Sequence, residues 1–205
     1  MKKTILIGGG GHALSLLEMV EDINQITGYA DFTVCKEMPI PYLGTDEDIL
    51  KNYSTNEYNV CISVVYTNKA SLELRKKLIK KFEQYEPVSF KSPTAIITPN
   101  ANIRNGVVIF HNCTINRCSI EEHSIINTGA IIEHGCKLGK NVFVGTGAVI
   151  CGDVTIGNNV FIGAGTVIRD GITIQDNAII GMGSLVTKNI LQEGVYYGSP
   201  AQKHE

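Results

Sequence analysis

The second half of this chain repeats an aliphatic residue every six positions. From residue 120 the series is unbroken and consists of Ile120, Ile126, Ile132, Leu138, Val144, Ile150, Ile156, Ile162, Ile168, Ile174, Ile180 and Val186. The same step runs upstream through Ile97, Ile103, Ile109 and Ile115, so one five-residue interval separates two phases of one pattern. A period of six matches neither a helix (3.6) nor a half-buried strand (2.0), so the chain must turn at every repeat. The pattern predicts a β-solenoid of stacked short strands.

Two further positions of each repeat fit a solenoid. The residue two places before the aliphatic residue is mostly small or β-branched, which suits a narrow core, as in Cys118, Ser124, Ala130, Cys136, Val142, Ala148, Val154, Val160 and Thr166. The residue directly after it is often glycine, for which we expect the positive φ of a tight corner. Because no repeat can bury its own aliphatic residue, sixteen repeats are expected to stack into about five three-sided coils.

Composition bounds the class of protein. A chain of 205 residues, 43% of them apolar, can hold one large or two small domains. The 18 lysines and arginines nearly balance the 20 aspartates and glutamates, which argues against binding to nucleic acid or to a membrane surface. The absence of a 20-residue apolar run or a leader-like segment leads us to expect a cytoplasmic protein. The six cysteines show no CxxC spacing and are expected to be reduced core residues.

The first ninety residues lack the six-residue repeat and alternate between strand and helix patterns. Strands are expected at residues 4–7, near 29–34 and at 60–65, with helices after residue 12 and from about 69 to 84. This order predicts a small parallel α/β sheet. We therefore expect two domains, residues 1–92 and residues 93–205.

A glycine-rich loop, residues 8–11, joins the first strand to the first helix. Such a loop lets the backbone approach a phosphate and aim its amides at it. Gly8-x-Gly10-x-x-Ala13 fits a dinucleotide fingerprint, with Asp31 placed to meet a ribose. However, a domain of ninety residues is too short for the two halves that hold a dinucleotide. Nucleotide binding of some kind and a purely structural tight turn both remain open on the sequence alone.

Several motifs together resemble one family. The chain has Gly9-Gly10-Gly11-His12 after its first strand, Ile132-Glu133-His134 within the repeats and Gly198-Ser199-Pro200-Ala201 near its end. This combination resembles the sialic acid O-acetyltransferases and nucleotide-aminosugar N-acetyltransferases, a family of hexapeptide-repeat acyltransferases. The resemblance implies an amino-terminal half-Rossmann domain and a left-handed parallel β-helix. It also implies acetyl-CoA as acyl donor, a nucleotide-linked amino sugar as acceptor, and a homotrimer.

The same resemblance assigns roles to individual residues. His134 matches the family's catalytic histidine. The matches to the nucleotide-sugar loop and its acidic partner are Gly10, Gly11, His12 and Asp31. The solenoid positions expected to contact acetyl-CoA are Gly152, Ala164 and Met182. No metal is implied.

Two positions depart from the family pattern. The residue after the catalytic histidine is usually acidic and orients its ring, but here it is Gly135. A second histidine usually lies nine residues on, where this chain has Phe143. Glu133 is one candidate to orient the ring instead. If orientation limits the rate, an aspartate introduced at residue 135 is expected to raise activity.

The chemistry of acyl transfer suits a histidine. An amine that attacks a thioester must lose a proton, and an imidazole titrates near neutral pH. Cys136 occupies a small inward position and is expected to be core rather than a nucleophile. His111 and His123 are expected to be surface residues at corners. Exposed aromatic side chains at Phe143, Phe161 and Tyr196 would favour a trimer interface.

Three alternatives stay open. Transfer to a sugar hydroxyl, as in sialic acid O-acetylation, would use the same base. A zinc site on His111, His123 and His134, as in gamma-type carbonic anhydrases, would leave the amino-terminal domain unexplained. A non-catalytic nucleotide-sugar sensor is the third, because of Gly135 and Phe143.

Overall fold

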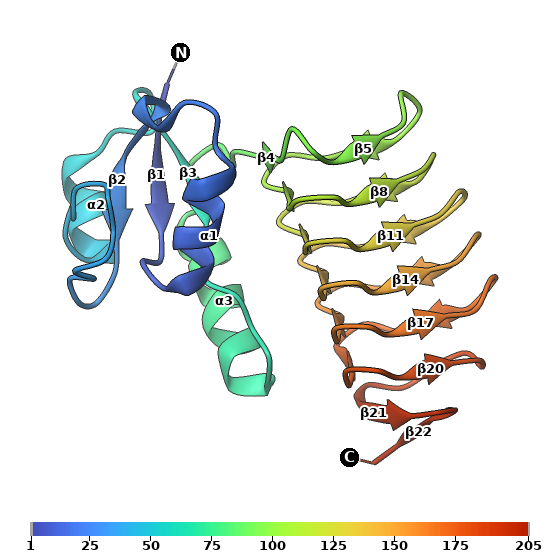
Figure 1. Ribbon diagram of the computed structural model, residues 1–205. Coiled ribbons are helices and arrows are strands. Elements are labelled where there is room, and N and C mark those ends of the chain that lie inside the picture. Colours follow the sequence, from blue (N-terminus) through green and yellow to red (C-terminus); the bar gives the residue numbers. More distant parts are fainter. Residues whose placement is uncertain (1, 205) are drawn as a thin grey trace. The chain divides into compact units, whose positions relative to one another are not determined.

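The computed structural model describes residues 2–204 of the chain. The chain divides into two compact units, one ending at Phe90 and one beginning at Lys91 (Figure 1). Each unit has its own hydrophobic core. Within residues 2–204, none of the helices has the length and apolar character needed to cross a membrane.

The first unit is a three-stranded parallel sheet with helices, as the sequence predicted. Its elements in chain order are β1 (Lys3–Ile7), α1 (Gly11–Met19), a 3-10 turn (Ile23–Gln25), β2 (Ile26–Ala30), α2 (Asp46–Asn52), β3 (Tyr58–Ile62) and α3 (Lys69–Lys81). The strand order is β2-β1-β3, with β1 parallel to both neighbours. All three carboxyl ends therefore lie at one edge of the sheet, where the loops after the strands meet.

Two elements of this unit differ from the sequence prediction. Strand β2 ends at Ala30 instead of continuing to about residue 34, because the Tyr29 hydroxyl hydrogen-bonds the backbone of Cys35 and turns the chain back. The segment beyond it is exposed, with Phe32 at 76%. Helix α2 was not expected, because its seven residues are too few for a periodic pattern; a capping box between Thr45 and Asp48 starts it.

The second unit is a solenoid of two-residue strands (Figure 1). The strands are β4 (Phe90–Lys91), β5 (Ile96–Ile97), β6 (Asn102–Ile103), β7 (Val108–Ile109), β8 (Thr114–Ile115), β9 (Ser119–Ile120), β10 (Ile125–Ile126), β11 (Ile131–Ile132), β12 (Lys137–Leu138), β13 (Phe143–Val144), β14 (Val149–Ile150), β15 (Thr155–Ile156), β16 (Phe161–Ile162), β17 (Val167–Ile168), β18 (Thr173–Ile174), β19 (Ala178–Ile180), β20 (Leu185–Val186), β21 (Gly194–Gly198) and β22 (Ala201–Lys203). They form three sheets, ordered β22-β21-β19-β16-β13-β10-β7-β4, β20-β17-β14-β11-β8-β5 and β18-β15-β12-β9-β6.

The three sheets differ in the residues that point outward. In the two-residue strands from β5 onward the second residue points toward the core, so the first points away from it. In the sheet of β5 to β20 the outward residues form what we call the aliphatic face, made of Ile96, Thr114, Ile131, Val149, Val167 and Leu185. In the sheet of β6 to β18 they form the polar face, made of Asn102, Ser119, Lys137, Thr155 and Thr173. The faces thus have different chemistry.

The periodic aliphatic residues line the core, as predicted. From Ile109 to Val186 they are no more than 2% exposed, while Ile97 and Ile103 at the open end are partly buried. Paired strands lie 18 residues apart, as in Ile132 with Ile150, but 17 apart where a coil contains the five-residue interval, as in Ile103 with Ile120. The irregular interval therefore shortens one coil by a residue and leaves the inward register intact.

The expected role of the glycines that follow the periodic residues was wrong. Gly139, Gly145 and Gly163 do not have positive φ; a Cβ there would instead lie 2.4–2.8 Å from backbone atoms of the next coil. The positive φ belongs to residues two places further on, such as Gly147 and Gly165. The first group permits close stacking of coils, and only the second permits the turn itself.

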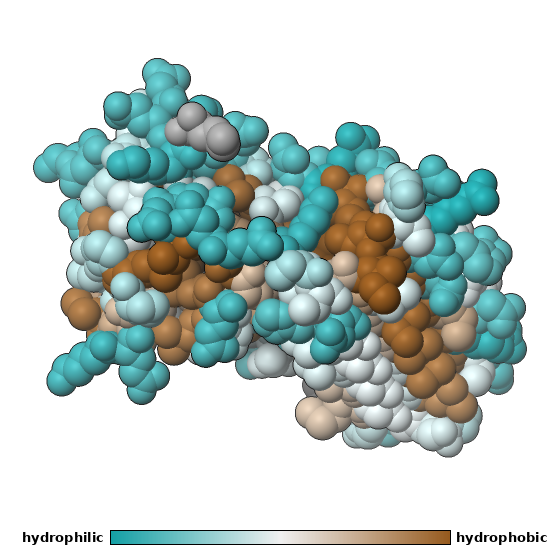
Figure 2. Space-filling view, turned by 45° about the horizontal axis from the view of Figure 1, so that its top comes forward, coloured by the Kyte–Doolittle hydropathy of each residue, from teal (hydrophilic) through white to brown (hydrophobic). Residues whose placement is uncertain are grey.

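The expected exposure of the aromatic residues was also wrong. Phe143 is 8% exposed and stacks on Phe161 of the next coil, with ring centroids 5.0 Å apart. Tyr196 is 9% exposed because it closes the last coil of the core, where its hydroxyl donates to the Gln192 carbonyl. Three exposed apolar residues of the solenoid, Ile96, Val167 and Leu185, lie on the aliphatic face (Figure 2), and Met182, Leu191 and Tyr197 are exposed elsewhere.

Candidate functional site

A pocket of about 320 Å³ lies within the first unit, at the carboxyl edge of its sheet. Its lining comes from the ends of the three strands, the segments that follow them, α2 and α3: Ile7, Gly8, Gly10, Gly11 and His12 at and after the end of β1, Ala30, Asp31 and Phe32 at and after the end of β2, Ser63, Val64 and Val65 after β3, Asp46 of α2, and Leu74 and Leu78 of α3. Four residues assigned from the sequence, Gly10, Gly11, His12 and Asp31, therefore meet in one pocket. Ligands of open α/β sheets bind at this edge.

The four glycines of the loop have two different roles. Gly8 has φ +111°, and a Cβ there would lie 2.7 Å from Val64. A Cβ on Gly9 would lie 2.5 Å from the Tyr29 ring. Cβ atoms at Gly10 and Gly11 would meet nothing within 4 Å. The first two glycines are thus required by packing, whereas the last two leave open space at the start of α1.

Asp31 is held by the loop that it faces. Its Oδ2 accepts a hydrogen bond from the Gly9 amide (2.7 Å), and its Oδ1 accepts one from the Phe32 amide (2.6 Å). On the other side of β1, the Ser63 hydroxyl donates to the carbonyls of Ile7 and Gly8. Two side chains, Asp31 after β2 and Ser63 after β3, thus fix the glycine loop that follows β1 from both sides.

A buried arginine lies behind the pocket, and sequence reasoning missed it. Arg75 of α3 is 1% exposed and donates from Nη1 to the carbonyls of Ile62 and Val64. Burial lowers the pKa of Arg75 to about 10, which still leaves it charged at neutral pH. The sequence spacing could have revealed this burial. Arg75 lies three residues after Leu72 and three before Leu78, which puts it on the buried face of the helix.

His12 is neutral in this setting. Burial, with a smaller contribution from the Arg75 charge, lowers the pKa of His12 to about 4. The side chain therefore offers one donor and one acceptor at neutral pH. The positive charge near the pocket comes from Arg75, not from His12.

In the solenoid, His134 is exposed at the corner between β11 and β12. Its ring lies against Gly152 at the same corner of the next coil, because a Cβ on Gly152 would be 2.7 Å from the ring's Cε1 and 3.0 Å from Nε2. The backbone fixes this pairing, since the Asp153 amide donates to the His134 carbonyl at 2.8 Å. The structure thus brings together one residue expected to be catalytic and one expected to bind the cofactor.

A side chain at the position after His134 would meet the side chain of Asp153. Gly135 has φ +73°, and a Cβ there would lie 1.9 Å from Oδ1 of Asp153. An aspartate at residue 135 would require the exposed Asp153 side chain to move aside, and its expected effect on activity stays a prediction. Glu133 is already engaged, because its Oε2 accepts a hydrogen bond from Asn116 Nδ2 at 3.1 Å. Within residues 2–204 no side chain hydrogen-bonds to the His134 ring.

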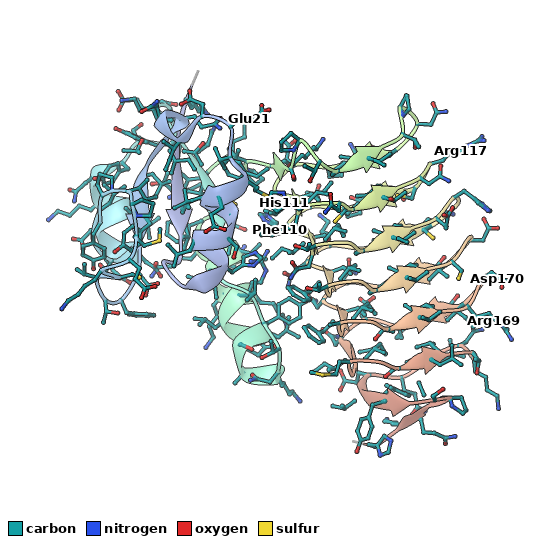
Figure 3. The ribbon with its side chains drawn as sticks, viewed as in Figure 1. Glu21, Phe110, His111, Arg117, Arg169 and Asp170 are labelled. Atoms are coloured by element: carbon teal, nitrogen blue, oxygen red, sulfur yellow. The ribbon has the colours of Figure 1, made fainter. Side chains whose placement is uncertain are left out.

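The other two residues expected to bind the cofactor lie at a different corner. Ala164 and Met182 follow β16 and β19, so they stand one coil apart at the corner that leads into β17 and β20. Figure 3 shows the separation: His111 marks this second corner, whereas Arg117, Arg169 and Asp170 mark the corner of His134, across the aliphatic face. One chain does not bring these residues together.

The remaining candidate residues are His111, His123 and Cys136. His111 lies at the corner of Ala164 and Met182, and His123 lies at the third corner of the coil; both histidines are partly buried. Nδ1 of His111 is 2.8 Å from the Ser92 hydroxyl. Cys136 is 1% exposed, and burial raises its pKa to about 11, so its role as core is confirmed. Among residues 2–204 no group of three or more His, Cys, Asp or Glu side chains is arranged to hold a metal ion.

Models of known protein families match both units of the chain. The model of the PglD N-terminal domain matches residues 3–82, and the model of the bacterial transferase hexapeptide (six repeats) matches residues 117–152 and 153–188. Together the two models cover most of the chain.

Solved structures match over the full length. PerB from Caulobacter crescentus, solved in complex with CoA and GDP-perosamine, is 26% identical with a TM-score of 0.87, covering 100% of this chain and 98% of that one. A mutant perosamine N-acetyltransferase from the same organism, with the same two ligands, is 24% identical with a TM-score of 0.87 and the same coverage.

A third structure has the same fold. The acetyltransferase domain of PglB from Neisseria gonorrhoeae, in complex with acetyl coenzyme A, is 21% identical with a TM-score of 0.88, covering 99% of both chains. These matches confirm the predicted half-Rossmann domain and left-handed parallel β-helix. The chain belongs to the hexapeptide-repeat acyltransferases of the left-handed β-helix type, as a member that carries a PglD amino-terminal domain.

Proposed function

We propose that this protein transfers an acetyl group from acetyl-CoA to the amine of a nucleotide-linked amino sugar. The observation that carries the proposal is the full-length, 26% identical match to PerB, which was solved with CoA and GDP-perosamine. The proposal is also supported by two features of the chain itself, a pocket lined by glycines in the first unit and an exposed histidine at a corner of the solenoid.

The pocket of the first unit is the proposed site for the nucleotide sugar, through Gly10, Gly11, His12 and Asp31. The open space at Gly10 and Gly11 lies at the amino-terminal end of α1, whose first-turn amides have no side-chain cap. Free amides and the helix dipole favour phosphate there, and the buried charge of Arg75 adds to that field. The exposed ring of Phe32 at the rim offers a flat apolar surface to a base.

His134 is the proposed general base. The reaction forms a C–N bond to the acetyl group and breaks its C–S bond, so the attacking nitrogen must give up a proton. The exposed imidazole can accept that proton directly. Packing against Gly152 limits the ring to a narrow range of positions, which favours catalysis because a base must be held near the nitrogen it deprotonates.

The protein is proposed to act as a homotrimer. The residues proposed to bind acetyl-CoA occupy two corners of the solenoid. Gly152 lies beside His134, whereas Ala164 and Met182 lie at the other edge of the aliphatic face. Six residues of extended chain, up to about 20 Å, separate the two corners. A second chain packed on this face would bring its own corner beside the first chain's His134. The face supports such packing, because Ile96 is 65%, Val167 38% and Leu185 36% exposed (Figure 2).

The decisive experiment is an acetyl-transfer assay. Purified protein is mixed with acetyl-CoA and a panel of UDP-, GDP- and dTDP-linked amino sugars, with release of free CoA thiol as readout. We expect turnover with at least one amino sugar and none with its hydroxyl analogue. His134→Asn is expected to lower kcat by about 10² to 10⁴. His123→Asn, at a different corner, is the matched control and should retain activity.

Two results would contradict the proposal. Turnover with a hydroxyl acceptor and not with an amine would identify an O-acetyltransferase. Binding of a nucleotide sugar without any release of thiol would identify a non-catalytic sensor.

A further inference from the structure

The position that usually carries an acid beside the catalytic histidine is glycine in this chain, yet a carboxylate lies there. It comes from Asp153, eighteen residues further along the chain and one coil on. Its Oδ1 is 1.9 Å from the point where the first side-chain atom of residue 135 would be. The Asp153 carboxylate can therefore occupy that place because residue 135 is a glycine and has no side chain.

The local backbone holds Asp153 in register with the histidine. The Asp153 amide donates to the His134 carbonyl at 2.8 Å, and Gly135 donates to the Arg117 carbonyl of the preceding coil at 3.0 Å. Gly152, directly before Asp153, is the residue on which the His134 ring packs. One short segment thus supplies both the backbone on which the ring packs, at Gly152, and a carboxylate beside residue 135, from Asp153.

The Asp153 carboxylate is also available, whereas that of Glu133 is not. Within residues 2–204, Asp153 accepts no side-chain hydrogen bond and forms no ion pair, and its side chain is exposed. Glu133 is bound by Asn116. The other charged or titratable groups at this corner are Arg117 on the preceding coil, Cys151 on the same coil as Asp153, and Arg169 and Asp170 one coil beyond.

We infer that Asp153 is the positioning residue for His134, replacing across two coils the acid that Gly135 lacks in sequence. This inference rests on the proposed role of His134 as general base. When the ring takes the proton of the attacking amine it becomes a cation, and a carboxylate beside residue 135 at the same corner stabilises that cation and favours one ring orientation. Asp153 acts through the imidazole and exchanges no proton with the substrate.

The test uses Asp153→Asn, which keeps the shape of the side chain and removes its charge. We expect kcat to fall about 10-fold with KM for acetyl-CoA within about twofold. Asp170→Asn removes a carboxylate from the same corner, two coils from His134, and is the matched control. It should leave kcat and KM unchanged.

A double-mutant cycle separates positioning from general stability. In the His134→Asn background, Asp153→Asn should have no further effect on the residual rate, because the group through which it acts is gone. In the absence of any substrate, ¹⁵N NMR of the His134 ring should show one dominant tautomer in the wild-type protein. Asp153→Asn should return it toward the mixture found in free histidine.

The outcomes distinguish this inference from the proposed function. If His134→Asn abolishes turnover but Asp153→Asn behaves as wild type in rate and tautomer, the role of Asp153 is excluded and the general base stands. If His134→Asn retains full turnover, the general base is wrong and both ideas fail. An equal loss in Asp153→Asn and Asp170→Asn would mean that only the net charge of the corner matters, which also overturns the inference.

Discussion

The imidazole of His134 rests on the backbone of Gly152, a residue from the next coil, with Cε1 2.7 Å from where a Cβ at residue 152 would be. This contact leaves no space for even a methyl group beneath the ring. The identity of residue 152 therefore controls where the proposed base can point.

Gly152→Ala should displace the ring while the solenoid stays folded, because φ at residue 152 lies outside the positive range that only glycine tolerates well. We expect kcat to fall by about 10- to 100-fold, since a displacement of about 1 Å is costly in an oriented reaction. Steady-state kinetics and thermal melting measure the two effects. In the His134→Ala background the same change has no ring to displace and should cost nothing further.

Gly135→Ala should destabilise the solenoid more than Gly147→Ala. Both glycines have similar positive φ, +73° and +64°, so both changes carry the same backbone strain of about 1 kcal/mol. Only at residue 135 would the new Cβ collide with Asp153, whereas residue 147 faces open space. Chemical denaturation of the two variants gives the comparison. Equal losses would show that Asp153 moves aside freely.

Gly11→Leu and Gly8→Ala should separate binding from folding in the first unit. The leucine points into open space at the pocket, so we expect a loss of at least 10-fold in nucleotide-sugar affinity with little change in stability. The alanine meets Val64 at 2.7 Å with φ +111°, so it should lower stability by more than about 1 kcal/mol. Calorimetry and melting distinguish them. Full affinity in Gly11→Leu would mean that the loop is only a turn.

The stability of the first unit should depend on His12 in mildly acidic solution. Burial lowers the pKa of His12 to about 4 in the folded protein, below the 6.5 of the unfolded chain. The unfolded state therefore binds the proton first, and stability present above pH 6.5 is lost as the pH falls toward 4. Hydrogen exchange of peptides from β1 to β3 at pH 7 and pH 5 measures this loss. His12→Gln should reduce the difference; an unchanged difference would assign it to another group.

Val167→Asp should disrupt the proposed trimer, because it places a charge on the aliphatic face between Val149 and Leu185. Thr155→Asp adds the same charge to the polar face and is the matched control. Light scattering should give a threefold mass for wild type and control, and the mass of a single chain for Val167→Asp. A wild-type protein with the mass of one chain would exclude the assembly.

Much of the architecture follows from local sequence patterns. A six-residue period fixes which residue of each repeat points inward, and the residues from Ile109 to Val186 are buried as that rule requires. The order of strands and helices in the first ninety residues likewise predicts a parallel sheet, so the loops after β1 and β2 had to meet at one edge. The sequence alone is therefore sufficient to group Gly10, Gly11, His12 and Asp31.

What surrounds His134 was decided only by the tertiary structure. Gly152 and Asp153 lie eighteen residues from His134 and Gly135, and periodicity alone does not say which side chains of neighbouring coils touch. That depends on register, which the hydrogen bond from Asp153 to the His134 carbonyl sets. The burial of Arg75 depends in the same way on carbonyls at the end of β3 that only folding brings to it. Sequence determined the direction in which each residue points, whereas contacts between distant segments required the stacked coils and the assembled sheet.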